Sequence, residues 1–292
     1  MDFSWSQDQT ELRRQVLEYA RQRLDLDVDE RVREHRFCRT SWGRAAEFGL
    51  TGLCVPEALG GSGLDAVSTA AALEALGEGC RDGGLVFALS AHLFACVMPI
   101  VEYGGDELRR RFVPALVGGR IGANAITEAG AGSDVYALRT TARRSGGSYV
   151  VDGEKSFVSN GPEADCFVVY ATVAPEHGYL GLVALVVERG TPGLRVGEPF
   201  TKVGLTTCPT SAVYFDSCRV PVANRIGGEG DGAKVFAQSM RWERSCLFAA
   251  YLGSMKRQLD ATVSFARSRR QFRRAIGKNQ AVSHRIANMK VR

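Results

Sequence analysis

Apolar residues in the first part of the chain recur every three or four positions, a spacing typical of amphipathic helices. These helical signals run from Ser6 to about Gly119. The stretch Val67–Tyr103 is apolar nearly all round and is interrupted at Gly77–Gly84, which predicts two buried helices joined by a short turn. We therefore expect an N-terminal helical domain over residues 1–119.

From about Arg120 the period of the apolar pattern falls to two, which predicts β-strands. Asp152-Gly153 lies between two of these strands and favours a two-residue hairpin, because a type I′ turn needs positive φ at both positions. We therefore expect an antiparallel β-domain over residues 120–228. Its strands are expected around Val150–Val151, Phe157–Val158, Phe167–Tyr170, Leu182–Val187 and Ala212–Phe215.

Helical periodicity returns and predicts one long helix over Asp231–Phe265. A second helix is expected from Gln280 to the last residue, Arg292, with no cap, glycine or proline to end it. Residues 229–292 are therefore expected to be the first part of a helical bundle, truncated within an element. The whole chain is expected to be an α+β multidomain protein. One face of the long helix carries Phe236, Met240, Glu243, Leu247 and Ala250.

Composition narrows the class of protein. Hydrophobic residues make up 45% of the chain and charged residues 24%, as in an ordinary globular protein. We expect no stretch that reaches the roughly 20 apolar residues needed to cross a bilayer, and the first residues lack a signal-peptide pattern. The eight cysteines form no CxxC pair and the four histidines no paired spacing, which argues against a metal site or a disulfide framework. A cytoplasmic protein with buried thiols, no metal and no membrane contact is expected.

The net charge of +5 is concentrated in RSRRQFRR, residues 267–274. One interpretation of this basic run is that its charged side chains are simply exposed to solvent. A nucleic-acid site would need interleaved aromatic residues, and Phe272 is the only one there, so we expect no nucleic-acid partner. Arginine is also suited to a diphosphate, because its guanidinium donates hydrogen bonds in pairs.

The segment NAITEAGAGS, Asn124–Ser133, predicts a strand that runs into a turn. The turn is expected to need glycine at Gly130 and Gly132, to expose backbone N–H groups and to set the hydroxyls of Thr127 and Ser133 on one side. Such a turn suits a ligand rich in acceptors, such as the edge of a flavin or a phosphate. A plain loop between strands is the alternative. No G-x-G-x-x-G opens a helix after a strand here, which excludes a dinucleotide fingerprint.

Four segments together resemble the acyl-CoA dehydrogenase family. TEAGAGSD resembles the family signature TEPGAGSD, with Ala129 in place of proline. GEKSFVSNG (Gly153–Gly161), PEALGGSGLD (Pro56–Asp65) and RSRRQFRRAIGKNQAVSHRIANM (Arg267–Met289) resemble three further family motifs, in the family order. The resemblance covers essentially the whole chain. It implies an N-terminal helical domain, a middle β-domain, a C-terminal four-helix bundle and FAD as cofactor.

The resemblance also implies roles for residues of these motifs. The first two motifs are expected to hold the flavin ring, and Ser133 also to lie along the substrate. The basic segment is expected to reach the flavin of a neighbouring subunit, which implies a homodimer or homotetramer. The expected flavin residues are Ile126, Thr127, Gly132, Ser133, Phe157 and Ser159 from the middle domain, and Arg269, Phe272 and Gln280 from the neighbour.

A carboxylate base is also implied. Most members carry it beyond the region that matches this chain, but isovaleryl-CoA and long-chain types place it on the long helix before an arginine, as in Glu243-Arg244. Glu243 lies on the apolar face, where poor solvation would raise its pKa and suit it to act as a base. An ion pair or simple exposure is the alternative. Arg244 is expected to bind substrate. Arg241 stands where members often have an acidic residue, which hints at an unusual thioester.

Three functions remain open on these grounds. The first is FAD-dependent α,β-dehydrogenation of an acyl-CoA in fatty acid metabolism, with electrons passed to an electron-transfer flavoprotein. The second is the same reaction on an acyl group held by a carrier protein in secondary metabolism. The third is a non-catalytic truncated or partner-dependent subunit. The long helix is expected to expose apolar surface and to promote association.

Overall fold

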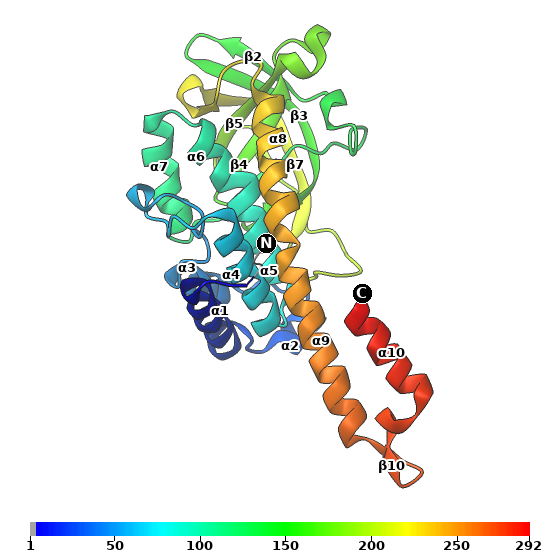
Figure 1. Cartoon of the computed structure of the whole chain (residues 1–292). Helices are drawn as coiled ribbons and strands as arrows, with labels where there is room; N and C mark the ends of the chain where they lie inside the picture. The colour runs from blue at the N-terminus through cyan, green and yellow to red at the C-terminus, as the bar shows by residue number, and fades with distance from the viewer. Residues whose placement is uncertain (1–3) are drawn as a thin grey trace.

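The computed structural model describes residues 4–292, so Met1–Phe3 at the start of the predicted N-terminal domain lie outside the described residues. Helices, then a sheet, then helices again follow one another along the chain (Figure 1). This order confirms the expected α+β class. The first group of helices comprises α1 (Gln7–Tyr19), α2 (Val28–Arg33), α3 (Arg39–Glu47), α4 (Ala66–Gly79), α5 (Gly83–His92), α6 (Met98–Tyr103) and α7 (Asp106–Val117).

Local signals set the ends of these helices. Ser6 caps α1, because its hydroxyl accepts from the Gln9 backbone while the Gln9 side chain accepts from the Ser6 N–H. The predicted break between the two buried helices spans the residues from Cys80 to Asp82. Asp82 caps α5 through the Leu85 N–H, 3.0 Å from its carboxylate.

The run Gly83–Tyr103 corrects the expectation about apolar length. It is a 21-residue helix that passes from α5 through a π-helical turn, Leu93–Val97, into α6, and by length and composition it is apolar enough to cross a membrane. In this fold, 83% of its most apolar window is buried. The run is therefore a core helix, surrounded by the other helices and one face of the sheet.

The middle part is one mixed sheet whose strands run in the order β6-β7-β3-β2-β4-β5-β8, with β1 paired to β4. Most pairs are antiparallel, as expected, but β1 and β2 both pair with β4 in parallel. The parallel pair aligns Gly122 with Cys166, and the pair of β4 and β5 aligns Cys166 with Glu188. The strands are β1 (Gly122–Ala125), β2 (Thr141–Ser145), β3 (Ser148–Ser159), β4 (Cys166–Thr172), β5 (Leu182–Glu188), β6 (Leu194–Val196), β7 (Thr210–Pro221) and β8 (Arg225–Ile226).

The predicted hairpin at Asp152-Gly153 is wrong. These residues lie inside β3, and the chain reverses at Gly146–Gly147, between β2 and β3. Gly153 instead sits at a bulge against β7, with φ +149°. A Cβ there would meet the Thr140 backbone at 2.8 Å. Glycine is therefore required at this position by the bulge and by the close approach of the Thr140 backbone.

The predicted long helix is confirmed, with an irregularity in the middle. It consists of α8 (Gly232–Trp242), a π-helical turn (Glu243–Leu247) and α9 (Ala249–Ser268). Helix α9 crosses α4 closely, because Gly77 and Gly253 leave no room for a Cβ between the two backbones. This crossing fixes the long helix against the N-terminal helices.

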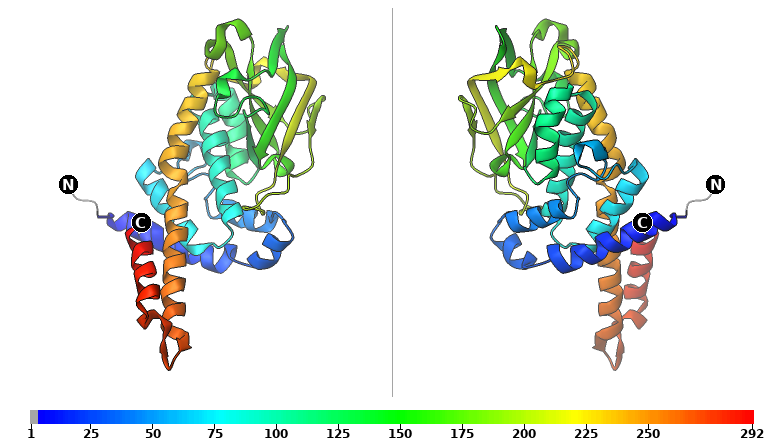
Figure 2. Two further views of the ribbon diagram at one scale, coloured as in Figure 1. Left: turned by 90° about the vertical axis from the view of Figure 1, so that its right-hand side faces the viewer. Right: turned by 90° about the vertical axis from the view of Figure 1, so that its left-hand side faces the viewer.

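Beyond the crossing, the chain forms an arm that projects from the body (Figure 2). It consists of the end of α9, the hairpin of β9 (Arg270–Gln271) and β10 (Arg274–Ala275), and α10 (Gln280–Val291), which runs back beside α9. The expected exposure of apolar residues is observed on α9 and just before it. Phe248, Leu252, Met255 and Phe265 are each at least 48% exposed. Seven of the eight cysteines are buried free thiols, and Cys38 is half-buried.

Candidate functional site

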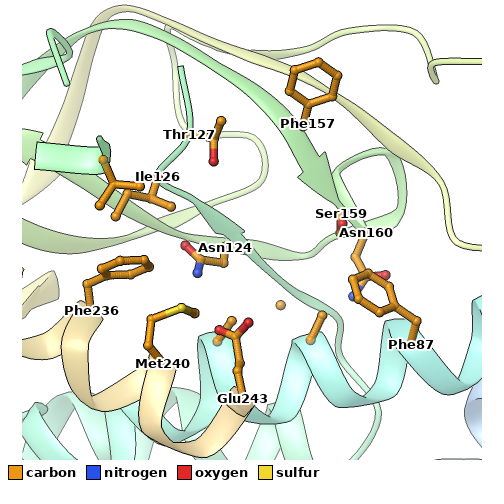
Figure 3. A pocket seen from close by; sticks show the side chains of 14 residues that line it. Phe87, Asn124, Ile126, Thr127, Phe157, Ser159, Asn160, Phe236, Met240 and Glu243 are labelled. Carbon is orange, nitrogen blue, oxygen red and sulfur yellow. The ribbon is translucent and has the colours of Figure 1, made fainter. Parts of the chain in front are cut away.

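A cavity of about 280 Å³ lies between two helices and the ends of two strands (Figure 3). Helices α5 and α8 form one wall, and β1 with the segment after it and the end of β3 form the other. Most of its surface is apolar, with a few polar groups. It is lined by Phe87, Ala91, Ala95, Gly122, Asn124, Ile126, Thr127, Val135, Phe157, Ser159, Asn160, Phe236, Met240 and Glu243.

The two predicted flavin segments meet at this cavity. The Ser156 N–H donates to the Thr127 carbonyl at 2.8 Å, which joins the segment after β1 to β3. Ile126 and Thr127 from the first segment, and Phe157 and Ser159 from the second, line the same space. The structure therefore brings together four of the six flavin residues predicted from the middle domain.

A buried ion pair lies behind this junction. Lys155 is fully buried, and its Nζ donates to Glu128 Oε1 at 2.8 Å and to the Ile126 carbonyl at 3.0 Å. Burial lowers the pKa of Lys155 to about 8, against the opposing effect of Glu128. Burial disfavours the charge on Glu128 too, but hydrogen bonds from Lys155 and Thr140 outweigh it and lower its pKa. The pair fixes the TEAGAGS segment to β3.

Phe157 has a conformation that L-residues seldom adopt. Its φ is +56°, the residue is 66% exposed, and its ring lies 5.4 Å from that of Phe200 between ring centroids. A bulky residue at positive φ costs free energy, and such outliers cluster at binding sites. Asn160 also has positive φ, but it is buried and its amide donates to the Ala88 carbonyl at 3.0 Å. The end of β3 is thus held so that an aromatic ring faces outward at the cavity mouth.

The turn after Thr127 corrects part of the sequence prediction. Neither Gly130 nor Gly132 has positive φ, and a Cβ on either would meet no atom of the chain within 4 Å. The fold itself therefore does not demand glycine there. Gly132 and Ser133 are exposed and do not line the cavity. The open strip beside the glycines, the exposed Phe157 ring and the two hydroxyls at the mouth fit a flat polycyclic ligand.

Glu243 points into the cavity from the opposite wall (Figure 3). Burial raises its pKa to about 7, although a hydrogen bond from Ser239 at 3.1 Å and the charge of Arg244 act in the other direction. Glu243 makes no ion pair within 4 Å in the described part of the chain, which disfavours the ion-pair alternative. A carboxylic acid that changes protonation near neutral pH is suited to proton transfer.

The π-helical turn begins at Glu243 and changes the face of the helix. Phe236, Met240 and Glu243 line the cavity together, but Leu247 does not, although all were expected on one face. The extra residue of a π-turn shifts the register of everything after it, and such turns are frequent at functional sites. Arg244 is exposed and lies outside the cavity-lining set, so its predicted contact with substrate is not formed by this cavity.

Trp242 anchors the start of this turn. Its indole N–H donates to Glu102 Oε1 at 2.8 Å, and its ring stacks on Phe94 at 5.9 Å between centroids. Arg241, one residue earlier, is exposed and donates to Gln238 at 3.1 Å outside the cavity. Trp242 therefore holds the backbone from which Glu243 enters the cavity.

The three residues predicted to reach a neighbour lie on the arm, away from the cavity (Figure 1). Arg269, Phe272 and Gln280 are all exposed, Phe272 by 91%. Phe272 and Arg273 form the hairpin turn with φ of +50° and +62°. Two positive φ values in a two-residue turn favour Asn-Gly, so a phenylalanine there is strained as well as exposed.

Sequence reasoning missed several residues that line the cavity. Phe87 and Asn160 flank its far end, and Asn124 lies at its centre (Figure 3). Asn124 opens the NAITEAGAGS segment and is the only polar residue of β1, GANA. Its place between two buried alanines was the signal that could have identified it, because alternate strand residues face opposite sides.

Comparison with known proteins identifies the family. Three family models match: the acyl-CoA dehydrogenase N-terminal domain over residues 6–120, the middle domain over 123–218 and the C-terminal domain over 230–292. L-prolyl-[peptidyl-carrier protein] dehydrogenase of Pseudomonas fluorescens is 51% identical over 100% of this chain and 77% of its own length. The protein of the same name from Serratia is 43% identical over 100% of this chain and 76% of its own length.

A solved structure agrees with these relatives. PigA with FAD and proline has a TM-score of 0.97 and 42% identity, over 100% of this chain and 76% of its own. The expected family, and with it the FAD cofactor and the oxidation of a CH–CH bond, are confirmed. The chain therefore belongs to the acyl-CoA dehydrogenase family.

Proposed function

We propose that this chain dehydrogenates an L-prolyl group held as a thioester on a peptidyl carrier protein, with Glu243 as the base. The observation that carries the proposal is a half-buried carboxyl, with a pKa raised to about 7, that points into an apolar cavity beside the two flavin segments. The prolyl group and its carrier are supported by the names of two relatives that are 51% and 43% identical to the whole chain. An unusual thioester also agrees with Arg241 in place of an acidic residue.

The residues at the cavity mouth would hold FAD. Phe157 offers a ring face, and Thr127 and Ser159 offer hydroxyls, while Ile126 closes the apolar side. Gly132 and Ser133 are exposed beside this mouth, and a Cβ on Gly130 or Gly132 would meet no atom of the described chain within 4 Å. When bound there, FAD supplies the acceptor for the hydrogen and electron pair that leave Cβ of the substrate.

Glu243 would remove the α-proton. The thioester carbonyl acidifies the Cα–H bond, and the carboxylate takes the proton as the Cα=Cβ double bond forms. Phe236 and Met240 flank Glu243 with apolar surface, which disfavours the charged carboxylate and keeps it reactive as a base. The Trp242–Glu102 hydrogen bond and the π-turn keep it directed at the cavity.

The arm supports a proposal about assembly. Arg269, Phe272 and Gln280 are exposed and do not reach the cavity of their own chain, so a second copy would bring them to its flavin. A homodimer or homotetramer is proposed on this ground. An electron-transfer flavoprotein is proposed as electron acceptor, and the buried free thiols agree with a reducing cytoplasm.

The decisive experiment compares substrates on the FAD-loaded protein, expressed from its full reading frame. L-prolyl-carrier protein, the matching L-prolyl-CoA and a straight-chain butyryl-CoA are each mixed with enzyme, and flavin bleaching is followed at its visible absorbance band. We expect fast bleaching with the prolyl-carrier protein and little with butyryl-CoA. Fast bleaching with butyryl-CoA alone would contradict the proposal and favour a fatty acyl-CoA substrate.

A further inference from the structure

Asn124 lies at the centre of the cavity wall formed by β1. Its neighbours Ala123 and Ala125 are buried in the core, whereas Asn124 lines the cavity and carries its carboxamide toward α8 (Figure 3). It pairs through its backbone with Val168 of β4, inside the sheet. A side chain on a strand of the sheet is held more precisely than one on a loop, so the carboxamide has a defined position in the site.

The carboxamide has no partner among residues 4–292. Asn124 Oδ1 is buried and accepts no hydrogen bond from the described chain. The nearby lining side chains Ile126, Phe236 and Met240 are apolar. A buried amide without a partner is disfavoured, and a few placed polar groups in an apolar pocket are what fixes the orientation of a ligand.

Two other asparagines of the same chain show how a structural amide behaves here. Asn160 donates to the Ala88 carbonyl at 3.0 Å, and Asn224 donates to the Val186 carbonyl at 2.9 Å. Both are buried and both join separate elements of the fold. The side-chain oxygen of Asn124, by contrast, joins no other element of the described chain. Its amide is therefore available to a bound molecule.

We infer that Asn124 accepts a hydrogen bond from the ring N–H of the prolyl group and selects α-amino acyl thioesters over aliphatic ones. This inference rests on the proposed function. Glu243 must face the Cα–H, and the nitrogen of a prolyl group is attached to that same carbon. Asn124 and Glu243 enter from opposite walls, so a hydrogen bond at nitrogen turns the ring and directs Cα–H to the base.

At position 124 a neutral hydrogen-bond acceptor is more favourable than a charged one. An aspartate at position 124 would put a second carboxylate in the same apolar cavity as Glu243, and like charges would further disfavour the anionic form of the base. An asparagine offers the acceptor oxygen without that charge. A straight-chain acyl group has no N–H at Cα and would leave the amide unpaired, which is the kind of mismatch that gives strong discrimination.

The test uses two carrier-protein thioesters that differ in one atom. L-prolyl-carrier protein is compared with cyclopentanecarbonyl-carrier protein, in which CH₂ replaces the ring N–H. The enzyme is the FAD-loaded protein from its full reading frame, as wild type, Asn124→Leu and Asn124→Ala. Asn124→Leu keeps the size of the side chain and removes its acceptor. The matched control is Met240→Leu, which alters the same cavity without touching a polar atom.

We expect Asn124→Leu to lower kcat/KM for the prolyl substrate by about 10- to 100-fold and to leave that for the cyclopentane substrate unchanged or higher. Met240→Leu should change both substrates alike. Equal losses on both substrates in Asn124→Leu and Asn124→Ala, with or without loss of bound FAD, would overturn the inference, because the residue would then serve the flavin or the fold. A wild-type enzyme that does not oxidise prolyl-carrier protein would overturn the proposed function and this inference with it.

Discussion

The cavity and the arm hold their functional residues in opposite ways. At the cavity, Glu243 is half-buried and accepts a hydrogen bond from Ser239, and the adjacent Trp242 donates to Glu102 of the same chain. On the arm, Arg269 and Phe272 are exposed, next to the end of α9, the two-stranded hairpin and α10 (Figure 2). The proposed proton-transfer residue is therefore positioned by the chain itself, whereas the proposed diphosphate and flavin contacts of the arm await another molecule.

The two regions also differ in how strain is supported. Phe157 at the cavity mouth and Phe272 on the arm both have positive φ. Phe157 belongs to the end of β3, where Lys155, Val158 and Ser159 pair with β7 and the Ser156 N–H donates to the Thr127 carbonyl. Phe272 belongs to a hairpin of two residue pairs. A strained backbone conformation persists only where surrounding contacts hold it in place. The arm hairpin supplies fewer such contacts to Phe272 than β3 and its neighbours supply to Phe157.

The largest effect is expected from Glu243→Gln. This substitution keeps the shape of the side chain and removes the base, so turnover of the prolyl thioester should fall by about 10²–10⁴-fold while FAD and substrate still bind. Single-turnover flavin bleaching measures the loss. Glu107→Gln, which alters an exposed carboxylate outside the cavity, is the matched control and should retain most of the activity. Equal losses in the two variants would mean that Glu243 is not the base.

The next largest effect concerns stability at the cavity. Lys155→Met leaves the Glu128 carboxylate buried without its cation, and breaking one side of such a pair costs about 3–5 kcal/mol. Urea unfolding should report this loss together with weaker FAD retention. The double variant Lys155→Met, Glu128→Gln should recover part of the free energy, because no lone charge remains. If Lys155→Met is as stable as the wild type, the Lys155–Glu128 ion pair does not stabilise the site.

A pH-dependent effect of intermediate size is expected from Glu243 itself. Its pKa rises from 4.5 to about 7 on folding, so the folded protein binds the proton more tightly than the unfolded chain. The stability from this group is fully present below about pH 4.5 and is lost as the pH rises through about 7, by at most about 3 kcal/mol. Catalysis should show the opposite trend and increase through about pH 7, because the base must be deprotonated.

Unfolding curves at pH 5 and pH 8 test the stability part. The difference between the two values should be smaller in Glu243→Gln, which has no proton to release, than in the wild type. Ser239→Ala, which removes the hydrogen bond to Oε1, should move the activity midpoint to higher pH, because that bond favours the anion. Identical pH profiles of stability in wild type and Glu243→Gln would contradict the raised pKa.

Sequence patterns predicted the order of the elements and most of the cavity wall. The period of apolar residues gave the helix–sheet–helix order, and the two motifs carrying Thr127 and Phe157 met as expected. Chain reversal was harder to predict, because Asp152-Gly153 has turn chemistry but is held in β3 by ladders on both sides. Tertiary pairing outweighed the local signal there.

Other features could not be read from local patterns. The π-turn at Glu243 depends on packing against α4 and α5, so the helical spacing misplaced Leu247. The burial of Lys155 depends on the contact between β3 and the segment after β1, and a lysine inside a strand gives no sign of a buried partner. The role proposed for Asn124 depends on the opposite wall of the cavity, and Glu243 in that wall lies more than a hundred residues later in the chain.

The smallest effect on the fold, and the sharpest separation of the two regions, is expected from Phe272→Gly. Glycine adopts φ of +50° without strain, so the hairpin should be no less stable, and the free energy of unfolding should change by about 1 kcal/mol or less. If the arm serves a neighbouring flavin, removing the exposed ring should nevertheless weaken FAD binding by about tenfold, a loss typical of one buried aromatic contact.

Phe265→Ala, which removes another exposed ring of the arm outside the turn, is the control. Flavin titration and thermal unfolding of the same samples separate the two effects. A fall in melting temperature with unchanged FAD affinity would make Phe272 a structural residue of the arm and would leave the cavity residues as the whole of the flavin site.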